Sequence, residues 1–172
     1  MKIRQEQISD YGKVYELVKT SFATSSHSDG TEQDYLNELR NKDVFIPELS
    51  FVAEHESGEV IGQIVLYKTN ITMSDEIITE LVLSPICVHP VHFRRGIARA
   101  MMEQAFEIAA DLGYKAVFLC GDPPFYRKIG FVPTYEHHIY HITDTEKNAE
   151  WCMVRELVSG TLRNISGTVD IE

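Results

Sequence analysis

Apolar residues recur at helical spacing in three segments of the chain, which predicts three helices. The first follows Ser9, a candidate N-cap, and its inward positions are Val14, Leu17, Val18 and Phe22. The second opens at Thr31, with Asp34 in a capping-box position, and its inward positions are Tyr35, Leu36 and Leu39. The third spans residues 94–112 before Gly113, and its apolar set is Ile97, Met101, Ala105, Ile108 and Leu112.

Runs rich in β-branched and aromatic residues separate and follow these helices, which predicts strands. Residues 49–71 fit a hairpin whose two strands flank a turn at Ser57 and Gly58. Further strands are expected at residues 1–4, 78–90, 115–120, 131–137 and 151–157. Strands with helices between them predict an α/β (α+β) fold that contains at least one parallel strand–helix–strand crossover.

The composition narrows the functional classes. The chain has 172 residues, of which 44% are hydrophobic and 24% charged, so we expect a single domain over residues 1–172. No stretch approaches the roughly 20 apolar residues of a membrane span, and the first residues lack the apolar core of a signal peptide. We therefore expect a cytoplasmic protein without a membrane partner. The net charge of −10 argues against a nucleic-acid partner and is compatible with cationic substrates.

Neither the cysteines nor the histidines predict a metal site. The cysteines are odd in number and far apart in the chain: Cys87, Cys120 and Cys152. Their apolar neighbours favour reduced, buried thiols over a disulfide framework or a zinc site. Histidines gather at residues 89–92 and 137–141, without a carboxylate or thiolate at firm ligand spacing. We expect these histidines on the surface or in packing contacts.

The start of the third predicted helix carries an unusual charge pattern. A helix N-terminus bears about half a positive charge, so an exposed cation there is unfavourable by about 0.3–1 kcal/mol. Yet this helix has its basic residues at its start: Arg94, Arg95 and Arg99. No Asp or Glu occurs between residues 81 and 102, and Gly96 and Ala98 leave room for backbone N–H groups to approach a phosphate. An anion-binding turn is therefore favoured over a solvated charged turn.

The spacing of this turn resembles that of the GNAT superfamily of N-acetyltransferases. The hallmark of that family is a strand, then V-x-P, a three-residue step, and Q/R-x-x-G-x-G/A at the start of the central helix. Here residues 88–90 read Val-His-Pro and residues 93–98 read Phe-Arg-Arg-Gly-Ile-Ala, with Phe93 where Gln or Arg is usual. The fingerprints of other phosphate-binding loops, GxxxxGK[ST] and G-x-G-x-x-G after a strand, are absent from the sequence.

A second segment extends the resemblance. In the stretch CGDPPFYRKIGF, residues 120–131, Tyr126 stands four residues before Gly130 and Phe131, as a tyrosine does in many family members. The stretch is similar to the G-D-P-x-Y-Y-x-x-x-G-F segment of a bacterial branch of predicted acetyltransferases, with Phe125 in place of the first tyrosine. Residues 153–170 are also similar to the ending of that branch, so the resemblance covers nearly the whole chain.

The resemblance implies a mixed, mostly antiparallel central sheet with helices on both faces and a splayed parallel strand pair, residues 83–88 and 115–120. It implies acetyl-CoA as co-substrate and no metal. The pantetheine arm would bond to the backbone of Ile86, Cys87 and Val88, with an oxyanion donor near the last of these. The pyrophosphate would meet the turn formed by Phe93, Arg94, Arg95, Gly96, Ile97, Ala98 and Arg99. Tyr126 would lie at the sulfur of acetyl-CoA and protonate the departing thiolate.

The residue that would take a proton from the amine is less well defined. An alkylamine with a pKa of about 10 must lose a proton before it attacks. Glu80, at the start of the strand 78–90, is the candidate base and would act through a water molecule; the alternative is a solvated carboxylate at a strand end. For Tyr126 the alternative is packing, because Phe–Tyr pairs often cover the edge of a core.

The resemblance therefore implies an N-acetyltransferase that moves an acetyl group to a primary amine of a small molecule or a protein by direct attack. Acceptor-binding loops are expected at residues 20–48 and 132–150. GNAT proteins are often dimers, so the resemblance is compatible with a homodimer, but the sequence does not give the oligomeric state. Two other functions stay open: a catalytically silent module that binds acyl-CoA for sensing or scaffolding, and an unrelated nucleotide-phosphate binder. A binding module does not need an acid at Tyr126, and the missing fingerprints disfavour the nucleotide binder.

Overall fold

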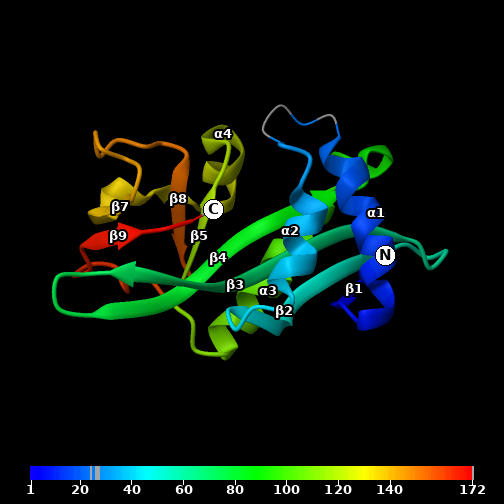
Figure 1. The fold of residues 1–172 in the computed structure, drawn as a ribbon, viewed down its shortest axis with the longest axis horizontal. Helices are drawn as coiled ribbons and strands as arrows, with labels where there is room; N and C mark the ends of the chain where they lie inside the picture. Colours follow the sequence, from blue (N-terminus) through cyan, green and yellow to red (C-terminus); the bar gives the residue numbers. More distant parts are fainter. Residues whose placement is uncertain (24, 26–27, 172) are drawn as a thin grey trace. The chain divides into compact units, whose positions relative to one another are not determined.

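The computed structural model describes residues 1–23, 25 and 28–171 (Figure 1). Its helices and strands are, in chain order, β1 (Lys2–Gln5), α1 (Tyr11–Phe22), α2 (Glu32–Leu39), β2 (Phe45–Glu54), β3 (Val60–Thr72), β4 (Ile77–Val88), α3 (Ile97–Asp111), β5 (Ala116–Cys120), α4 (Pro123–Tyr126), β6 (Val132–Pro133), β7 (Ile139–His141), β8 (Cys152–Glu156) and β9 (Gly167–Val169). Short 3₁₀ turns are η1 (Ile8–Asp10), η2 (Pro90–His92), η3 (Arg127–Ile129) and η4 (Thr134–His137).

The strands form a mixed sheet in the order β1-β2-β3-β4-β5-β8-β6, and β9 pairs with both β3 and β7. Pairing is antiparallel between β1 and β2, β3 and β9, β5 and β8, and β6 and β8. It is parallel between β4 and β5 and between β7 and β9. This arrangement confirms the predicted mixed, mostly antiparallel fold with a parallel strand pair, and α3 is the crossover that the β4–β5 pair requires.

Two compact units make up the fold: Met1–Leu66 with Ser84–Ile108, and Tyr67–Leu83 with Ala109–Glu172. We call them the first and the second unit. Strands β3 and β4 each contribute residues to both. The expectation of a single domain over residues 1–172 stays a prediction.

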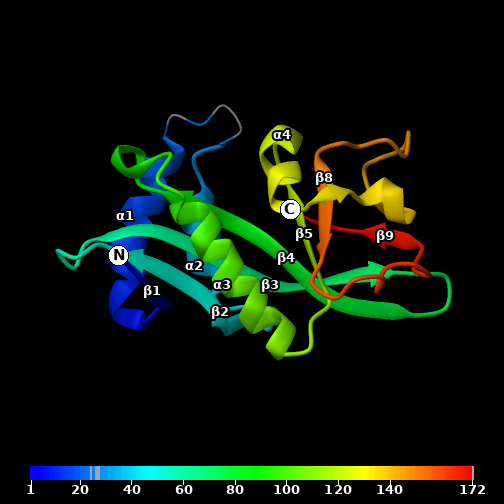
Figure 2. The same ribbon diagram turned by 180° about the vertical axis from the view of Figure 1, so that it is seen from behind.

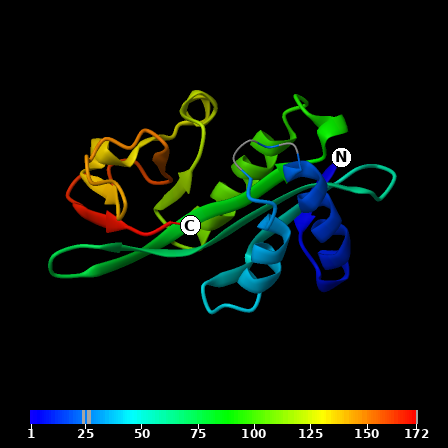
Figure 3. The same ribbon diagram turned by 45° about the horizontal axis from the view of Figure 1, so that its top comes forward.

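Helices cover both faces of the sheet in the first unit. The α1–α2 pair lies on one face of β2 and β3 and α3 lies on the other (Figures 1, 2 and 3). Helix α3 approaches the sheet closely at Gly62 of β3, where an added Cβ would lie 3.0 Å from Cε of Met101. A glycine at this position therefore lets the fully buried methionine pack directly on the strand.

The starts of the first two helices differ in detail from the prediction. Ser9 lies inside η1 and the N-cap of α1 is Asp10, so the assignment of Ser9 was wrong. The carboxylate of Asp10 accepts hydrogen bonds of 2.7 and 2.9 Å from Arg4, which fix it where the helix begins. Thr31 is the N-cap of α2 as predicted, but Asp34 accepts from the hydroxyl of Tyr15 instead of forming a capping box.

The helix predicted over residues 94–112 is α3, which begins three residues later and ends one residue earlier. Met101 and Ala105 are buried as expected. Leu112 follows the last helical residue and is 49% exposed, so its inward assignment was wrong.

In the second unit β5 is the strand between β4 and β8. Its register with β4 pairs Leu81 with Val117 and Val82 with Phe118. Of the strand predicted at residues 131–137, only Val132 and Pro133 form β6, and η4 follows. Proline has no N–H to donate, which explains why the ladder ends there.

Glu80 ties the beginning of β5 to β4. Its Oε2 atom accepts hydrogen bonds from the N–H groups of Lys115 (2.8 Å) and Ala116 (3.1 Å). The residue is 4% exposed, so the alternative of a solvated carboxylate was wrong. Burial raises the pKa of the Glu80 carboxyl above its ordinary value of 4.5, and the two N–H donors offset only part of that rise.

The raised pKa of Glu80 predicts a specific pH dependence of stability. The folded state binds the proton of the Glu80 carboxyl more tightly than the unfolded state does. The stabilisation of the fold by this bound proton is therefore complete below pH 4.5 and is lost as pH rises through the folded-state pKa of Glu80. Glu80→Gln keeps an acceptor oxygen and cannot ionise. We therefore expect the melting temperature of the variant, relative to the wild type, to increase between about pH 4 and pH 7. Thermal unfolding at several pH values measures it, with the exposed Glu76→Gln as control; a difference that does not change with pH would contradict the assignment.

Candidate functional site

The basic turn lies in the first unit, between the end of β4 and the start of α3. After Val88 the N–H of His89 donates to the carbonyl of Ile61 on β3 (2.8 Å), which anchors the strand end. The chain then makes the 3₁₀ turn η2 and reaches the first helical residue at Ile97. We call residues 93–99 the basic turn.

The backbone of the basic turn is unusual at two positions. Arg94 has φ +62° and Gly96 has φ +75°, and a positive φ is uncommon outside glycine. The hydrogen-bond ladder of α3 begins with the N–H of Ala100, which donates to the carbonyl of Gly96 (3.0 Å). The N–H groups just before Ala100 therefore precede the ladder, and alternating left-handed residues are typical of backbone nests that bind anions.

Space is open in front of this turn. Among the described residues, no heavy atom beyond its chain neighbours lies within 4 Å of a Cβ built on Gly96. The side chains of Phe93, Arg94 and Arg95 are exposed. Positive charge, backbone donors and room for a ligand thus coincide at one turn.

Arg99 has a partner that the sequence interpretation missed. Its Nε donates to the carboxylate of Glu103 one helical turn later (2.9 Å), just beyond the acid-free stretch that ends at residue 102. Both side chains are more than half exposed, and such a pair contributes only about 0.3–0.5 kcal/mol. This weak pairing leaves Arg99 able to turn toward an anion.

The last residues of β4, just before the basic turn, are predicted to bind the cofactor through their backbone atoms. Cys87 is buried, and burial raises the pKa of its thiol to about 12, so the side chain stays protonated and serves packing. Ile86 and Val88 flank it at the end of β4. In the described residues, no group of three His, Cys, Asp or Glu side chains is placed to hold a metal ion.

Tyr126 lies in the second unit, at a corner fixed by backbone bonds on both sides. β5 ends at Cys120, Asp122 is the N-cap of α4, and Pro123 takes the first helical position, where its missing N–H costs nothing. The N–H of Tyr126 donates to the carbonyl of Asp122 (3.1 Å), and its own carbonyl accepts from Phe131 (3.2 Å). We call residues 121–131 the tyrosine corner.

The ring of Tyr126 packs between two aromatic side chains and the backbone of Gly121. It meets Phe125 and Phe131 edge-on, with centroids 4.9 and 5.6 Å away. A Cβ on Gly121 would lie 2.8 Å from Cδ2 of the tyrosine and nearer still to Cε2. Gly121 is therefore needed for close approach, a requirement that the sequence interpretation did not identify because only the folded chain brings the two together.

The surroundings keep the phenol of Tyr126 neutral. Burial is the main cause that raises its pKa to about 12, and the negative charge of Asp122 adds to the effect. At neutral pH the hydroxyl is therefore protonated and can donate a hydrogen bond.

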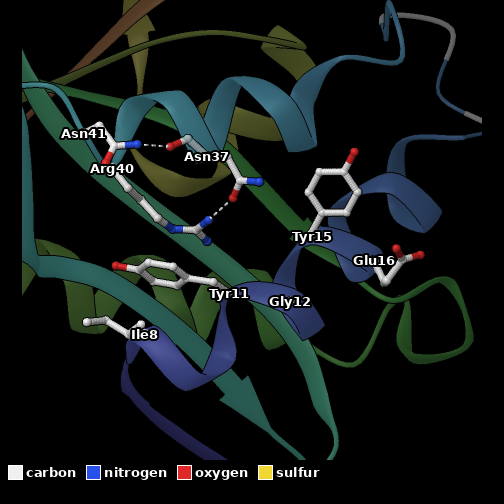
Figure 4. Close-up of a pocket in the computed structure, with 8 residues that line it drawn as sticks. All are labelled: Ile8, Tyr11, Gly12, Tyr15, Glu16, Asn37, Arg40 and Asn41. Atoms are coloured by element: carbon white, nitrogen blue, oxygen red, sulfur yellow. Dashed lines mark hydrogen bonds between the residues drawn. The ribbon is translucent and has the colours of Figure 1, made fainter.

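A cavity of about 700 Å³ in the first unit is lined by none of the predicted catalytic or cofactor-binding residues, although three of its lining residues fall within the expected acceptor loop 20–48. It is lined by Ile8, Tyr11, Gly12, Tyr15, Glu16, Asn37, Arg40 and Asn41 (Figure 4). Arg40 donates to Asn37 (2.6 Å) and stacks over the Tyr11 ring at 4.0 Å, and it also pairs with the buried Glu6 (2.6 Å). The guanidinium of Arg40 is thus already engaged by residues of the fold and does not point to a ligand in the cavity.

The two acceptor loops expected from the resemblance remain predictions. The expected acceptor loops, residues 20–48 and 132–150, belong to different units, and positions 24, 26 and 27 lie outside the described residues. Cys87 and Cys152 are buried as expected, but Cys120, the last residue of β5, is exposed, so the expectation of a buried thiol was wrong there. No helix within the described residues is long and apolar enough to cross a membrane.

Comparisons with known proteins agree with this picture. The chain is 25% identical over 170 residues to the uncharacterized N-acetyltransferase YhbS of Escherichia coli (strain K12), which covers 99% of this chain and 95% of that protein. The crystal structure of YhbS in complex with CoA has a TM-score of 0.86 at 23% identity, covering 99% of this chain and 89% of that one. A GNAT family acetyltransferase from Brucella melitensis in complex with acetyl-CoA has a TM-score of 0.78 at 21% identity, covering 99% and 95%.

A family model described as the acetyltransferase (GNAT) domain matches residues 2–134, a span that includes both the basic turn and the tyrosine corner. Because this match covers well over half of the sequence, the chain belongs to the GNAT acetyltransferase family.

Proposed function

We propose that this protein is an acetyl-CoA-dependent N-acetyltransferase that moves an acetyl group to a primary amine of a small molecule or a protein. The observation that carries the proposal is the backbone of the basic turn, where left-handed residues and a helix start leave N–H donors facing open space. Relatives of the same fold hold CoA or acetyl-CoA, which supports the choice of anion. The acceptor and the cytoplasmic location stay predictions.

The residues of the basic turn fit the phosphates of CoA. The N–H groups at the start of α3 are suitable donors for the pyrophosphate, and Arg94, Arg95 and Arg99 supply positive charge. Phe93 is exposed and would contact the ligand through its ring rather than through a polar group. The backbone of residues 86–88 would hold the pantetheine arm. Acetyl-CoA itself would supply the acyl group and a thiolate as leaving group.

Tyr126 is proposed to assist departure of the thiolate. Its pKa of about 12 keeps the proton in place, but a thiol has an ordinary pKa of ~8.5. Full transfer would therefore be uphill by roughly 5 kcal/mol unless the sulfur is desolvated as well. Donation of a hydrogen bond to the charge that develops on the sulfur has no such cost, so this smaller contribution is the one we propose.

Glu80 stays a candidate general base. Its raised pKa makes its carboxylate a stronger base than that of an ordinary glutamate, but its burial and its two bonds to backbone N–H groups favour a structural role. If Glu80 relays the proton of the amine, Glu80→Gln should lower kcat/KM by roughly 10²–10⁴-fold and remove the acidic limb of the pH profile. A profile of the same shape and height in the variant would leave Glu80 with the structural role alone.

The proposed activity is tested by the release of free CoA thiol from acetyl-CoA in the presence of a panel of amines and N-terminal peptides. Turnover with at least one acceptor is expected. If the protein binds acetyl-CoA with no turnover across the panel, the silent acyl-CoA-binding module becomes the better interpretation.

Substitution of Gly96 tests the cofactor site. Gly96→Glu adds volume and negative charge where the pyrophosphate is proposed to bind, and should weaken CoA binding by at least 10–10²-fold, since a charge-assisted hydrogen bond alone contributes about 1.5–3 kcal/mol. Gly96→Ala adds mainly backbone strain, and should weaken binding less. Titration calorimetry measures both.

The matched control is Gly58→Ala, which places a side chain on another glycine of positive φ (+85°) in open space. This variant should lose stability in the same way as Gly96→Ala and keep the affinity of the wild type. If folded Gly96→Glu binds CoA as tightly as the wild type, the cofactor assignment is wrong.

Replacement of Tyr126 by phenylalanine separates catalysis from packing. Tyr126→Phe keeps the ring and its contact with Gly121 and removes only the hydroxyl. We expect kcat to fall roughly 10–10²-fold if the hydroxyl donates a hydrogen bond, and up to 10⁴-fold if it transfers the proton. CoA affinity and melting temperature should change little. Tyr15→Phe, which removes an exposed hydroxyl bound to Asp34, is the control; wild-type turnover in Tyr126→Phe would support packing alone.

A further inference from the structure

Cys120 and Cys152 stand directly opposite each other on neighbouring strands. They are the last register pair of the antiparallel strands β5 and β8. The N–H of Gly121 donates to the carbonyl of Trp151 (2.9 Å), which makes that pair the hydrogen-bonded one. Since the two kinds of pair alternate, the cysteines form a non-hydrogen-bonded pair, with Cα atoms about 4.5 Å apart and side chains close together.

This spacing falls within the range of disulfides, whose Cα atoms lie roughly 4.4–6.8 Å apart. Both cysteines are free thiols here, and they share a hydrogen bond that lowers the pKa of Cys152 and raises that of Cys120. Their accessibility differs, because Cys120 is exposed whereas Cys152 is fully buried. One thiol can therefore meet an oxidant in solution and the other can resolve the product.

We propose that Cys120 and Cys152 form an oxidant-responsive dithiol that closes to a disulfide by exchange with a low-molecular-weight disulfide such as glutathione disulfide. The Cys120 thiol passes its proton along the hydrogen bond that it shares with Cys152, and the Cys120 thiolate so formed attacks one sulfur of the oxidant, forms a mixed disulfide and releases one small thiol. The Cys152 thiolate then attacks the Cys120 sulfur and releases the second small thiol. The two protein thiols are oxidised, the small disulfide is reduced to two thiols, and their two protons pass to the released thiolates.

The third cysteine provides an internal contrast. Cys87 is buried on β4, so an oxidant in solution does not reach its thiol as it reaches that of Cys120. It should stay reduced while the pair is oxidised. Cys120 directly precedes the tyrosine corner in the chain. The next residue is Gly121, against which the Tyr126 ring packs. The proposal does not depend on acetyl transfer.

The test uses the whole reduced chain, freed of reductant and incubated with excess glutathione disulfide. Intact mass and alkylation after denaturation should show the loss of two hydrogen atoms, one remaining thiol and no glutathione adduct. The closed loop should raise the melting temperature by roughly 5–15 °C, and dithiothreitol should reverse the change. Cys87→Ser should also lose two hydrogen atoms, but it should leave no alkylatable thiol, because the one that remains in the wild type is Cys87.

Two further variants separate the roles of the paired thiols. Cys152→Ala removes the resolving thiol and should trap one glutathione on Cys120. Cys120→Ser removes the accessible thiol and should take up no glutathione while folded. Three alkylatable thiols in the treated wild type, or a stable glutathione adduct on it, would overturn the proposal.

Discussion

The parallel pairing of β4 with β5 is the constraint on which the rest of the structure depends. Parallel neighbours cannot be joined by a hairpin, so the chain must leave β4 and return through a crossover, here α3. The buried carboxylate of Glu80 fixes the point of return through two backbone N–H groups. As a consequence, the basic turn follows the carboxyl end of β4 and the tyrosine corner follows that of β5.

Features of the site that depend on neighbours in the chain could be predicted from the sequence. The basic turn was identifiable because its arginines oppose the helix dipole, and the helices and long strands were identifiable from their periodicity. Even there, Glu103 escaped notice because the sequence does not show which acid an exposed arginine will meet. The short strands β7 and β9 escaped as well, since three residues carry too little pattern.

Features that depend on distant or cross-strand contacts could not be predicted. Gly96 and Gly121 look alike in sequence, but the first is required by its positive φ and the second by the approach of an aromatic ring. The pairing of Cys120 with Cys152 depends on the register of two strands separated by 31 residues of chain (151 − 120), and register is set by the whole sheet. The apparent isolation of these cysteines in the sequence was therefore misleading.

Burial gives Glu80 and Tyr126 a common property that bears on the proposed chemistry. In both groups desolvation raises the pKa, which means that their surroundings favour neutral over charged forms. The same physics acts with the opposite sign on an amine, because loss of water lowers the pKa of a cationic group. An amine desolvated beside Tyr126 would reach its neutral, nucleophilic form with little help from a base. The surroundings that make Tyr126 a weak acid would thus also reduce the need for Glu80 as a base.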